Sequence, residues 1–165
     1  MEQKAKYTMN RKEDILSRKD EILKKYWYKK YMEEYRNRLK MFVKSPLNDD
    51  DFLPLDFKDN LMNAIYHEMV FYKATIDFNR LDWYKDRLRP LISNLWDNTF
   101  FLSEELSEYC GCYKLSSLND LNWTFPFYPN GGWLGLISYD VTMHIVLSWY
   151  EEDDLQKLDI EIARM

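Results

Sequence analysis

Large apolar and polar residues alternate along the segment 136–150, which reads LISYDVTMHIVLSWY. The apolar residues occupy every odd position from Ile137 to Trp149, and most even positions are polar. A period of two places successive side chains on opposite faces of a strand. The β-branched residues of the segment also favour a strand over a helix. The pattern therefore predicts one long strand over residues 137–150, with an apolar face towards the core and a polar face towards solvent or a partner.

The alternation extends to both sides of this strand. Trp123, Phe125 and Phe127 alternate with other residues before a PNGG turn, and apolar residues alternate again after the acidic segment 151–154. Together these segments predict a three-stranded antiparallel β-meander over about residues 121–164. A four-residue loop at 151–154 would set the register by these pairs: Leu147 with Leu158, Ile145 with Ile160 and Met143 with Ile162.

Earlier in the chain, apolar residues recur three, four or seven positions apart, which indicates helices. Three long helices are predicted, over residues 10–43, from 56 to about 72 or 76, and over 81–96 with a kink or break at Pro90. A short helix is expected to follow before the two cysteines. No internal repeat is evident. We therefore predict an α+β fold in a single domain, residues 1–165. Its helical N-terminal two-thirds (about 10–109) would pack on one face of the C-terminal three-stranded antiparallel β-meander (about 121–164).

Charge is distributed unevenly along the chain, although the net charge is only −5. Residues 1–45 contain 14 basic and 7 acidic side chains, and the remaining 120 residues contain 9 basic and 21 acidic ones. The basic segment and the acidic remainder would either complement each other or present different faces to partners. No signal peptide and no bilayer-spanning apolar stretch are evident, so the sequence predicts no membrane partner. With only two cysteines, spaced as Cys-x-Cys, a disulfide scaffold is not expected, and we predict a cytoplasmic protein.

Candidate catalytic and metal-binding residues are few. The only soft metal ligands are Cys110, Cys112, His67 and His144, and their spacing does not match a zinc site. Neither a nucleophile motif nor a phosphate-binding loop is present. The sequence therefore predicts no cofactor, no metal site and no enzymatic activity, while an enzyme that uses Asp140 and His144 remains a third hypothesis.

An acidic segment flanked by aromatic residues is the first candidate for a binding surface. Acidic groups next to an aromatic anchor are suited to a basic site on another protein, because the charges steer association and the anchor holds the complex. Residues of the polar strand face would extend this surface. The predicted partner-binding residues are Tyr150, Glu151, Glu152, Asp153, Asp154, Asp140 and His144.

A basic aromatic segment, KKYWYKKY, is the second candidate. Its lysines could bind phosphates while an aromatic ring stacks on bases. Alternatively, the aromatic residues face the core and the lysine stems cover apolar surface, which is the interpretation we favour. The residues of the nucleic-acid hypothesis are Lys24, Lys25, Trp27, Tyr28, Lys29 and Lys30.

These observations favour a protein-binding function over nucleic-acid binding or catalysis. The leading hypothesis is a non-catalytic inhibitor, either an immunity protein against a toxin or a phage anti-defence protein. It would occlude the basic nucleic-acid-binding or catalytic cleft of a partner protein, such as a nuclease or another nucleic-acid-binding effector. The alternative is a nucleic-acid-binding accessory protein that uses the basic N-terminal helix.

Overall fold

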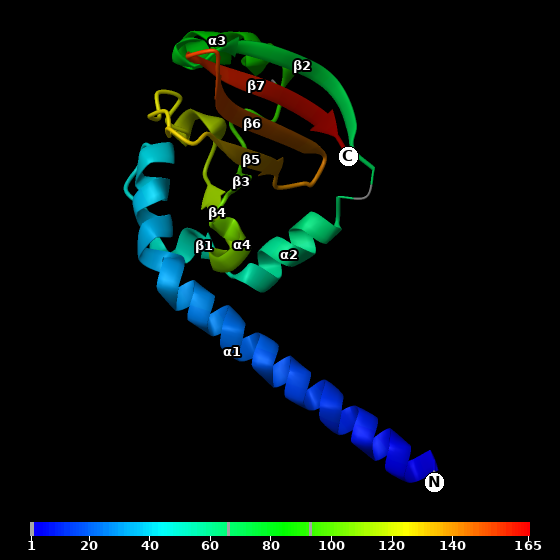
Figure 1. Ribbon diagram of the computed structural model, residues 1–165. Helices are drawn as coiled ribbons and strands as arrows, with labels where there is room; N and C mark the ends of the chain where they lie inside the picture. The colour runs from blue at the N-terminus through cyan, green and yellow to red at the C-terminus, as the bar shows by residue number, and fades with distance from the viewer. Residues whose placement is uncertain (1, 66, 93) are drawn as a thin grey trace.

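A seven-stranded antiparallel β-sheet forms the body of the protein, and a long helix projects from it (Figure 1). The computed structural model describes residues 2–65, 67–92 and 94–165, and describes side chains from residue 8 onwards. Within these residues the strands lie in the order β1-β4-β3-β5-β6-β7-β2. The strands are β1 (Phe52–Leu53), β2 (Met69–Asp77), β3 (Phe100–Glu104), β4 (Cys112–Leu115), β5 (Gly132–Ser138), β6 (Met143–Glu152) and β7 (Leu155–Arg164). The α-helices are α1 (Glu2–Phe42), α2 (Leu55–Asn63), α3 (Leu81–Leu88) and α4 (Ser107–Cys110).

The α+β class is correct, but the predicted three-stranded meander is wrong. Strands β1, β2 and β3 come from the part of the chain predicted to be helical, about residues 10–109, and β4 lies between that part and the predicted meander. The helix predicted over residues 56–76 is replaced by α2 and β2. The helix predicted over 81–96 ends at Leu88, and a 3₁₀ turn over Arg89–Leu91 follows, which agrees with the break expected at Pro90. Residues 66 and 93 of these predictions lie outside the described residues. Residues 121–127 form no strand, and among the described residues their only ladder contact is an isolated bridge between Val43 and Leu121.

The single strand predicted over 137–150 is also wrong, because a turn at residues 139–142 divides it into β5 and β6. Leu136 pairs with Ile145, so even positions of β5 share the core face with odd positions of β6. Tyr139, which the alternation assigned to the core, is 53% exposed in the turn. Apolar and polar residues alternate through this turn as they do in the strands, so the sequence pattern gave no sign of the turn.

The register of the β6–β7 hairpin differs from the predicted one by two residues. The strands continue to Glu152 and resume at Leu155, so the loop contains two residues instead of four. The pairs that form are Trp149 with Leu158, Leu147 with Ile160, Ile145 with Ile162 and Met143 with Arg164. The expectation that Trp149 is a core residue is confirmed, since only 2% of it is exposed.

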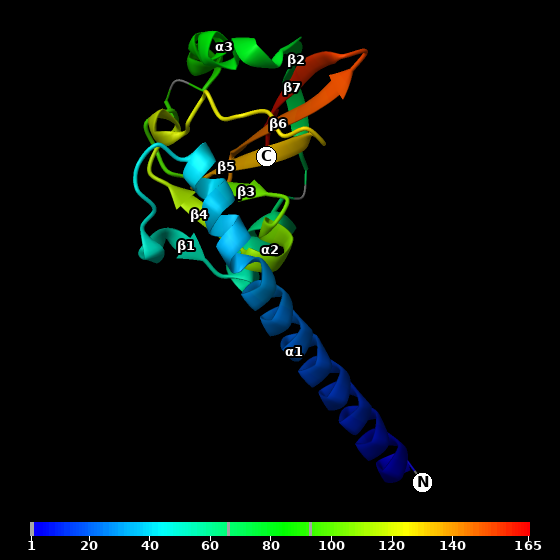
Figure 2. The ribbon, with the colours of Figure 1, turned by 60° about the vertical axis from the view of Figure 1, so that its left-hand side comes forward.

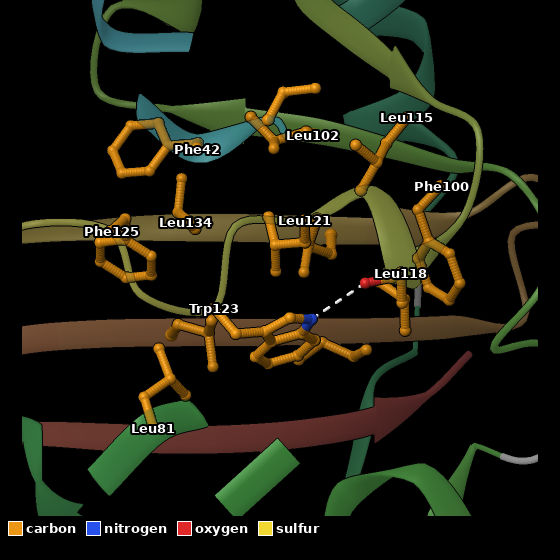
Figure 3. Packing of buried hydrophobic residues seen from close by; sticks show 14 of the residues in the cluster. Phe42, Leu81, Phe100, Leu102, Leu115, Leu118, Leu121, Trp123, Phe125 and Leu134 are labelled. Atoms are coloured by element: carbon orange, nitrogen blue, oxygen red, sulfur yellow. Dashed lines mark hydrogen bonds between the residues drawn. The ribbon is translucent and has the colours of Figure 1, made fainter. Parts of the chain in front are cut away.

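The hydrophobic core lies on one face of the sheet. The C-terminal half of α1 contributes buried Tyr35, Leu39 and Phe42, while α3 and the segment 118–128 cover the remainder of this face. The indole of Trp123 donates a hydrogen bond to the Leu118 carbonyl over 2.9 Å, which satisfies a buried polar group (Figure 3). Residues predicted as an outer strand therefore form part of the core layer.

The opposite face of the sheet is only partly covered. On β3, Phe101 packs edge-to-face against Phe57 of α2, with ring centroids 5.1 Å apart. Farther along the sheet the face carries polar side chains, including an ion pair between Lys73 and Glu161 with a 3.1 Å separation. The helical layer thus leaves strands β6, β7 and β2 accessible on this side.

Helix α1 continues far beyond the body (Figures 1 and 2). Side chains from Thr8 to Tyr26 are all exposed, and burial begins only at Trp27. Within the body, Arg38 forms an ion pair with the buried carboxylate of Glu104 on β3, with Nε and Oε2 2.7 Å apart. Burial raises the pKa of Glu104 to about 7 even though Arg38 acts in the opposite direction. None of the described helices is both long enough and apolar enough to cross a membrane.

Candidate protein-interaction surfaces

The acidic hairpin, residues 151–154, forms the tip of β6 and β7. Asp153 and Asp154 both have positive φ, 52° and 62°, as in a type I′ turn. This conformation is uncommon for residues other than glycine, although aspartate tolerates it better than most. All four carboxylates are exposed, and none forms an ion pair with another described residue. The acidic hairpin therefore exposes four negative charges, two at the end of β6 and two in the turn between β6 and β7, without an ion-pair partner among the described residues.

Tyr150 lies on the open face of the sheet, next to the acidic hairpin. Its hydroxyl donates a hydrogen bond to Asp159 over 3.2 Å, and Asp159 also accepts one from Thr75 over 2.7 Å. The ring is half-buried. Tyr150 is thus positioned on the predicted face, but its hydroxyl already has an intramolecular partner.

Asp140 and His144 have separate structural roles. The Asp140 carboxylate accepts hydrogen bonds from the Ser138 and Thr142 hydroxyls, each over 2.7 Å, and so holds the β5–β6 turn. Slight burial acts to raise the pKa of Asp140, but the hydrogen bonds from Thr142 and Ser138 outweigh it and lower the pKa. His144 instead contacts the carboxylate of Glu68 through Nδ1. No hydrogen bond joins Asp140 to His144 among the described residues, and neither lies in the acidic hairpin.

The basic aromatic segment, residues 24–31, lies where α1 leaves the body. Trp27 packs against Tyr109 and Tyr31, with ring centroids 5.6 Å and 5.8 Å apart, and the ammonium of Lys30 lies 4.9 Å from the Trp27 ring centre. Tyr28 is 45% exposed. Trp27 therefore joins the helix to the body, while the lysines of the segment, Lys24, Lys25, Lys29 and Lys30, are exposed.

The projecting part of α1 carries a surface that the sequence analysis missed. Its large apolar side chains are between 48% and 66% exposed. These residues are Met9, Ile15, Leu16, Ile22, Leu23 and Tyr26. The available signal was a seven-residue repeat, TMNRKED-ILSRKDE-ILKKYWY over residues 8–28, which corrects the expectation that the chain has no internal repeat.

The repeat separates two faces of the helix. At 100° per residue, positions 1, 2, 4 and 5 of each repeat fall within about 160° of arc, and positions 3, 6 and 7 fall on the opposite side. Positions 1 and 2 are mainly apolar, and positions 4 and 5 are mainly basic. All four acidic residues of the repeat, Glu13, Asp14, Asp20 and Glu21, occupy positions 6 and 7. We call positions 1, 2, 4 and 5 of residues 8–28 the basic-apolar face.

The acidic side of the helix faces an open groove of about 1020 Å³ between α1 and the body. From α1 the groove is lined mainly by positions 3, 6 and 7, including Glu13, Ser17 and Asp20, and from the body by Phe52 and Leu55. The basic-apolar face consequently points mostly away from the body. Leu16 and Leu23 lie at the edge of the basic-apolar face, and each also lines a groove against the body.

The two cysteines lie beneath α1 and are buried and unbonded. Burial raises the pKa of Cys110 to about 11 and that of Cys112 to about 12, so neither thiol forms a reactive thiolate near neutral pH. No group of three or more His, Cys, Asp or Glu side chains within residues 8–65, 67–92 and 94–165 is arranged to hold a metal ion. Comparison of the chain with protein-family models, with curated proteins and with solved structures finds no match.

Proposed function

We propose that this protein is a non-catalytic protein-binding protein whose docking element is the projecting part of α1. The observation that carries the proposal is the exposure of six large apolar side chains on one helix, from Met9 to Tyr26. Four of them form adjacent pairs one repeat apart, Ile15 with Leu16 and Ile22 with Leu23, so they line one side of the helix. Contiguous exposed apolar surface is characteristic of interaction sites.

The energetics support the same conclusion. Fully burying one aliphatic side chain of this size contributes about 1.5–3 kcal/mol. The body of the protein gains only part of this from Ile15, Leu16, Ile22 and Leu23, because all four are at least 48% exposed. A partner that covers them would gain the remainder. An isolated helix in water also receives little stability from propensity alone, so a partner would stabilise the projecting part.

The acidic hairpin supports a finer assignment to a protein inhibitor, of the toxin-immunity or phage anti-defence type. It lies at the end of the molecule remote from the projecting part of α1 (Figures 1 and 2). Its four carboxylates have no basic counterpart among the described residues, so they suit a basic cleft on a partner. In this function α1 docks the protein and the acidic hairpin, with Tyr150 beside it, occludes the cleft.

The proposal is tested by capturing partners from the native host with the full chain and two variants. One variant replaces Ile15, Leu16, Ile22 and Leu23 by serine, and the other replaces residues 151–154 by lysine. Loss of the captured proteins in the serine variant is expected, whereas a matched control with Asp14→Ser and Ser17→Ala on the opposite side of α1 should retain them. Equal capture by the serine variant would refute a docking role for α1.

The hairpin variant tests the inhibitor assignment separately. Once a partner is captured, the lysine reversal should slow its association at low salt, because peripheral charges act mainly on the association rate. An unchanged rate would reject the acidic hairpin as a contact. The nucleic-acid alternative is tested by titrating a random-sequence oligonucleotide, since binding that weakens steeply with salt would support it.

A further inference from the structure

The basic-apolar face repeats with a period of seven residues, which is about 10.5 Å along the helix. Positions 1 and 2 are apolar pairs in the second and third repeats, and positions 4 and 5 are basic pairs in the first and second. The first two repeats place Arg11 and Lys12, then Arg18 and Lys19, at the basic positions. None of these four forms an ion pair with another residue whose side chain the structure describes.

From this arrangement we infer that residues 8–28 pair with an α-helix of a partner protein that alternates apolar and acidic residues in the same seven-residue period. The two helices pack side by side along residues 8–28. This inference rests on the proposed protein-binding function and names the chemistry of the partner.

The period identifies the partner surface as a helix. A straight α-helix has 3.6 residues per turn, so a strict seven-residue pattern drifts by about 20° per repeat relative to a flat surface. A second helix that wraps around the first removes this drift, as in coiled coils, although here each repeat supplies one adjacent apolar pair instead of residues spaced by three and four. A lipid surface imposes no such period. Moreover, Lys12 and Lys19 interrupt the apolar strip that insertion into a bilayer requires.

Charge identifies the partner helix as acidic. The basic-apolar face has no acidic residue over residues 8–28, because the acids occupy positions 6 and 7. A second copy of this chain would therefore oppose basic residues to basic residues along the contact, which is unfavourable. A polynucleotide would match the charges but would leave Ile15, Leu16, Ile22 and Leu23 without an apolar counterpart. An acidic amphipathic helix satisfies both requirements.

The test uses synthetic helical peptides and the full chain. The probe peptide has three heptads with Ile-Leu at positions 1 and 2 and Glu-Glu at positions 4 and 5. One matched peptide has Lys-Lys in place of Glu-Glu, and another has Ser-Ser in place of Ile-Leu. Fluorescence anisotropy measures binding at low and at high salt. Anionic vesicles of phosphatidylcholine and phosphatidylserine, and sedimentation of the chain alone, test a lipid surface and a second copy.

The glutamate peptide should bind at least about tenfold more tightly than either matched peptide, because both charge and apolar contacts are needed. The chain with Arg18→Glu and Lys19→Glu should reverse the preference towards the lysine peptide, which a merely structural role of these exposed residues would not produce. Equal binding of all peptides, vesicle binding without peptide binding, or a dimer that the serine variant abolishes would each overturn the inference. Capture of partners through α1 without discrimination between the peptides would leave the proposed function standing and reject only the acidic helix.

Discussion

Replacing Gly111 by alanine should destabilise the protein more than any other glycine-to-alanine change in the sheet region. Gly111 joins α4 to β4 with φ 89° and ψ −153°, a conformation essentially confined to glycine. A Cβ atom there would lie 2.0 Å from the Leu53 carbonyl oxygen and 2.9 Å from the Pro54 carbonyl carbon. Both are backbone atoms, so no rotation of a side chain can relieve the clash.

The magnitude follows from two contributions. The backbone conformation costs an alanine about 1–3 kcal/mol, and forcing apart packed atoms costs about 1–3 kcal/mol. We expect a loss of about 2–6 kcal/mol in the free energy of unfolding. The strain acts on β1, because Leu53 pairs with Cys112, and on α1, because the Tyr35 hydroxyl donates to the Gly111 carbonyl over 3.3 Å.

Urea unfolding followed by tryptophan fluorescence measures this effect, with the shift in midpoint converted at constant slope. Gly135→Ala is the matched control, because its Cβ would meet only the ends of the His144 and Trp133 side chains at 3.4 Å. The control should lose less than about 1 kcal/mol. If both variants unfold at the same urea concentration, β1 moves away from Gly111 without cost, and the reasoning is refuted.

Three further predictions concern stability. Burial raises the pKa of Glu104 to about 7 from 4.5, so the folded protein binds this proton more tightly than the unfolded chain, and stability should fall by up to about 3 kcal/mol as pH rises between these values. Glu104→Gln should flatten that part of the pH profile of urea midpoints, and an unchanged slope would contradict the assignment. Ile145→Asp should lower the free energy of unfolding by more than about 4 kcal/mol, because it buries an unpaired charge. Thr142→Asp should lower it by about 1 kcal/mol, through the loss of one hydrogen bond in the turn. Equal melting temperatures of the two variants would show that burial does not distinguish the two sites. The double change Asp153→Asn and Asp154→Gly should stabilise the protein by about 1 kcal/mol because both positions have positive φ, and calorimetry would show no gain if the turn relaxes.

The sequence predicted elements well where local signals were sufficient. The helix over 10–43 matches most of α1, since Pro46 follows its end and helical spacing runs through Tyr35, Leu39 and Phe42. The polar face of β6 was also assigned correctly at Tyr150, because its parity relative to Trp149 survives the change of register.

The errors arose where the decisive contact is distant in the chain. In β2, Met69, Tyr72 and Ile76 are spaced as in a helix, but pairing with β7 decides in favour of a strand. In the β5–β6 turn, Val141 contributed to a strand pattern although it adopts φ 55°, which β-branched residues rarely do. The alternation of Tyr139 and Val141 could not show that Asp140 stabilises a turn here by accepting hydrogen bonds from Ser138 and Thr142.

The candidate surfaces were predictable to different degrees. Composition alone identified the acidic hairpin and the basic aromatic segment. The basic-apolar face was missed because the spacing of Ile15 and Ile22 was interpreted only as evidence for a helix, whereas the structure shows that this part of α1 extends beyond the body (Figure 1). A search for seven-residue periodicity would have identified them from the sequence.

The position of β2 at the edge of the sheet also determines when the fold can be completed. Its one neighbour in the sheet is β7, which the ribosome synthesises about eighty residues later. At a synthesis rate of about 5–20 residues per second, roughly 4–16 s pass between the synthesis of β2 and that of β7. The apolar start of this strand, Met69 to Phe71, is exposed even in the folded protein. During that interval, the backbone groups of β2 therefore have no strand partner, and its apolar side chains are available to other chains. Chains interrupted before β7 should therefore require chaperones or aggregate.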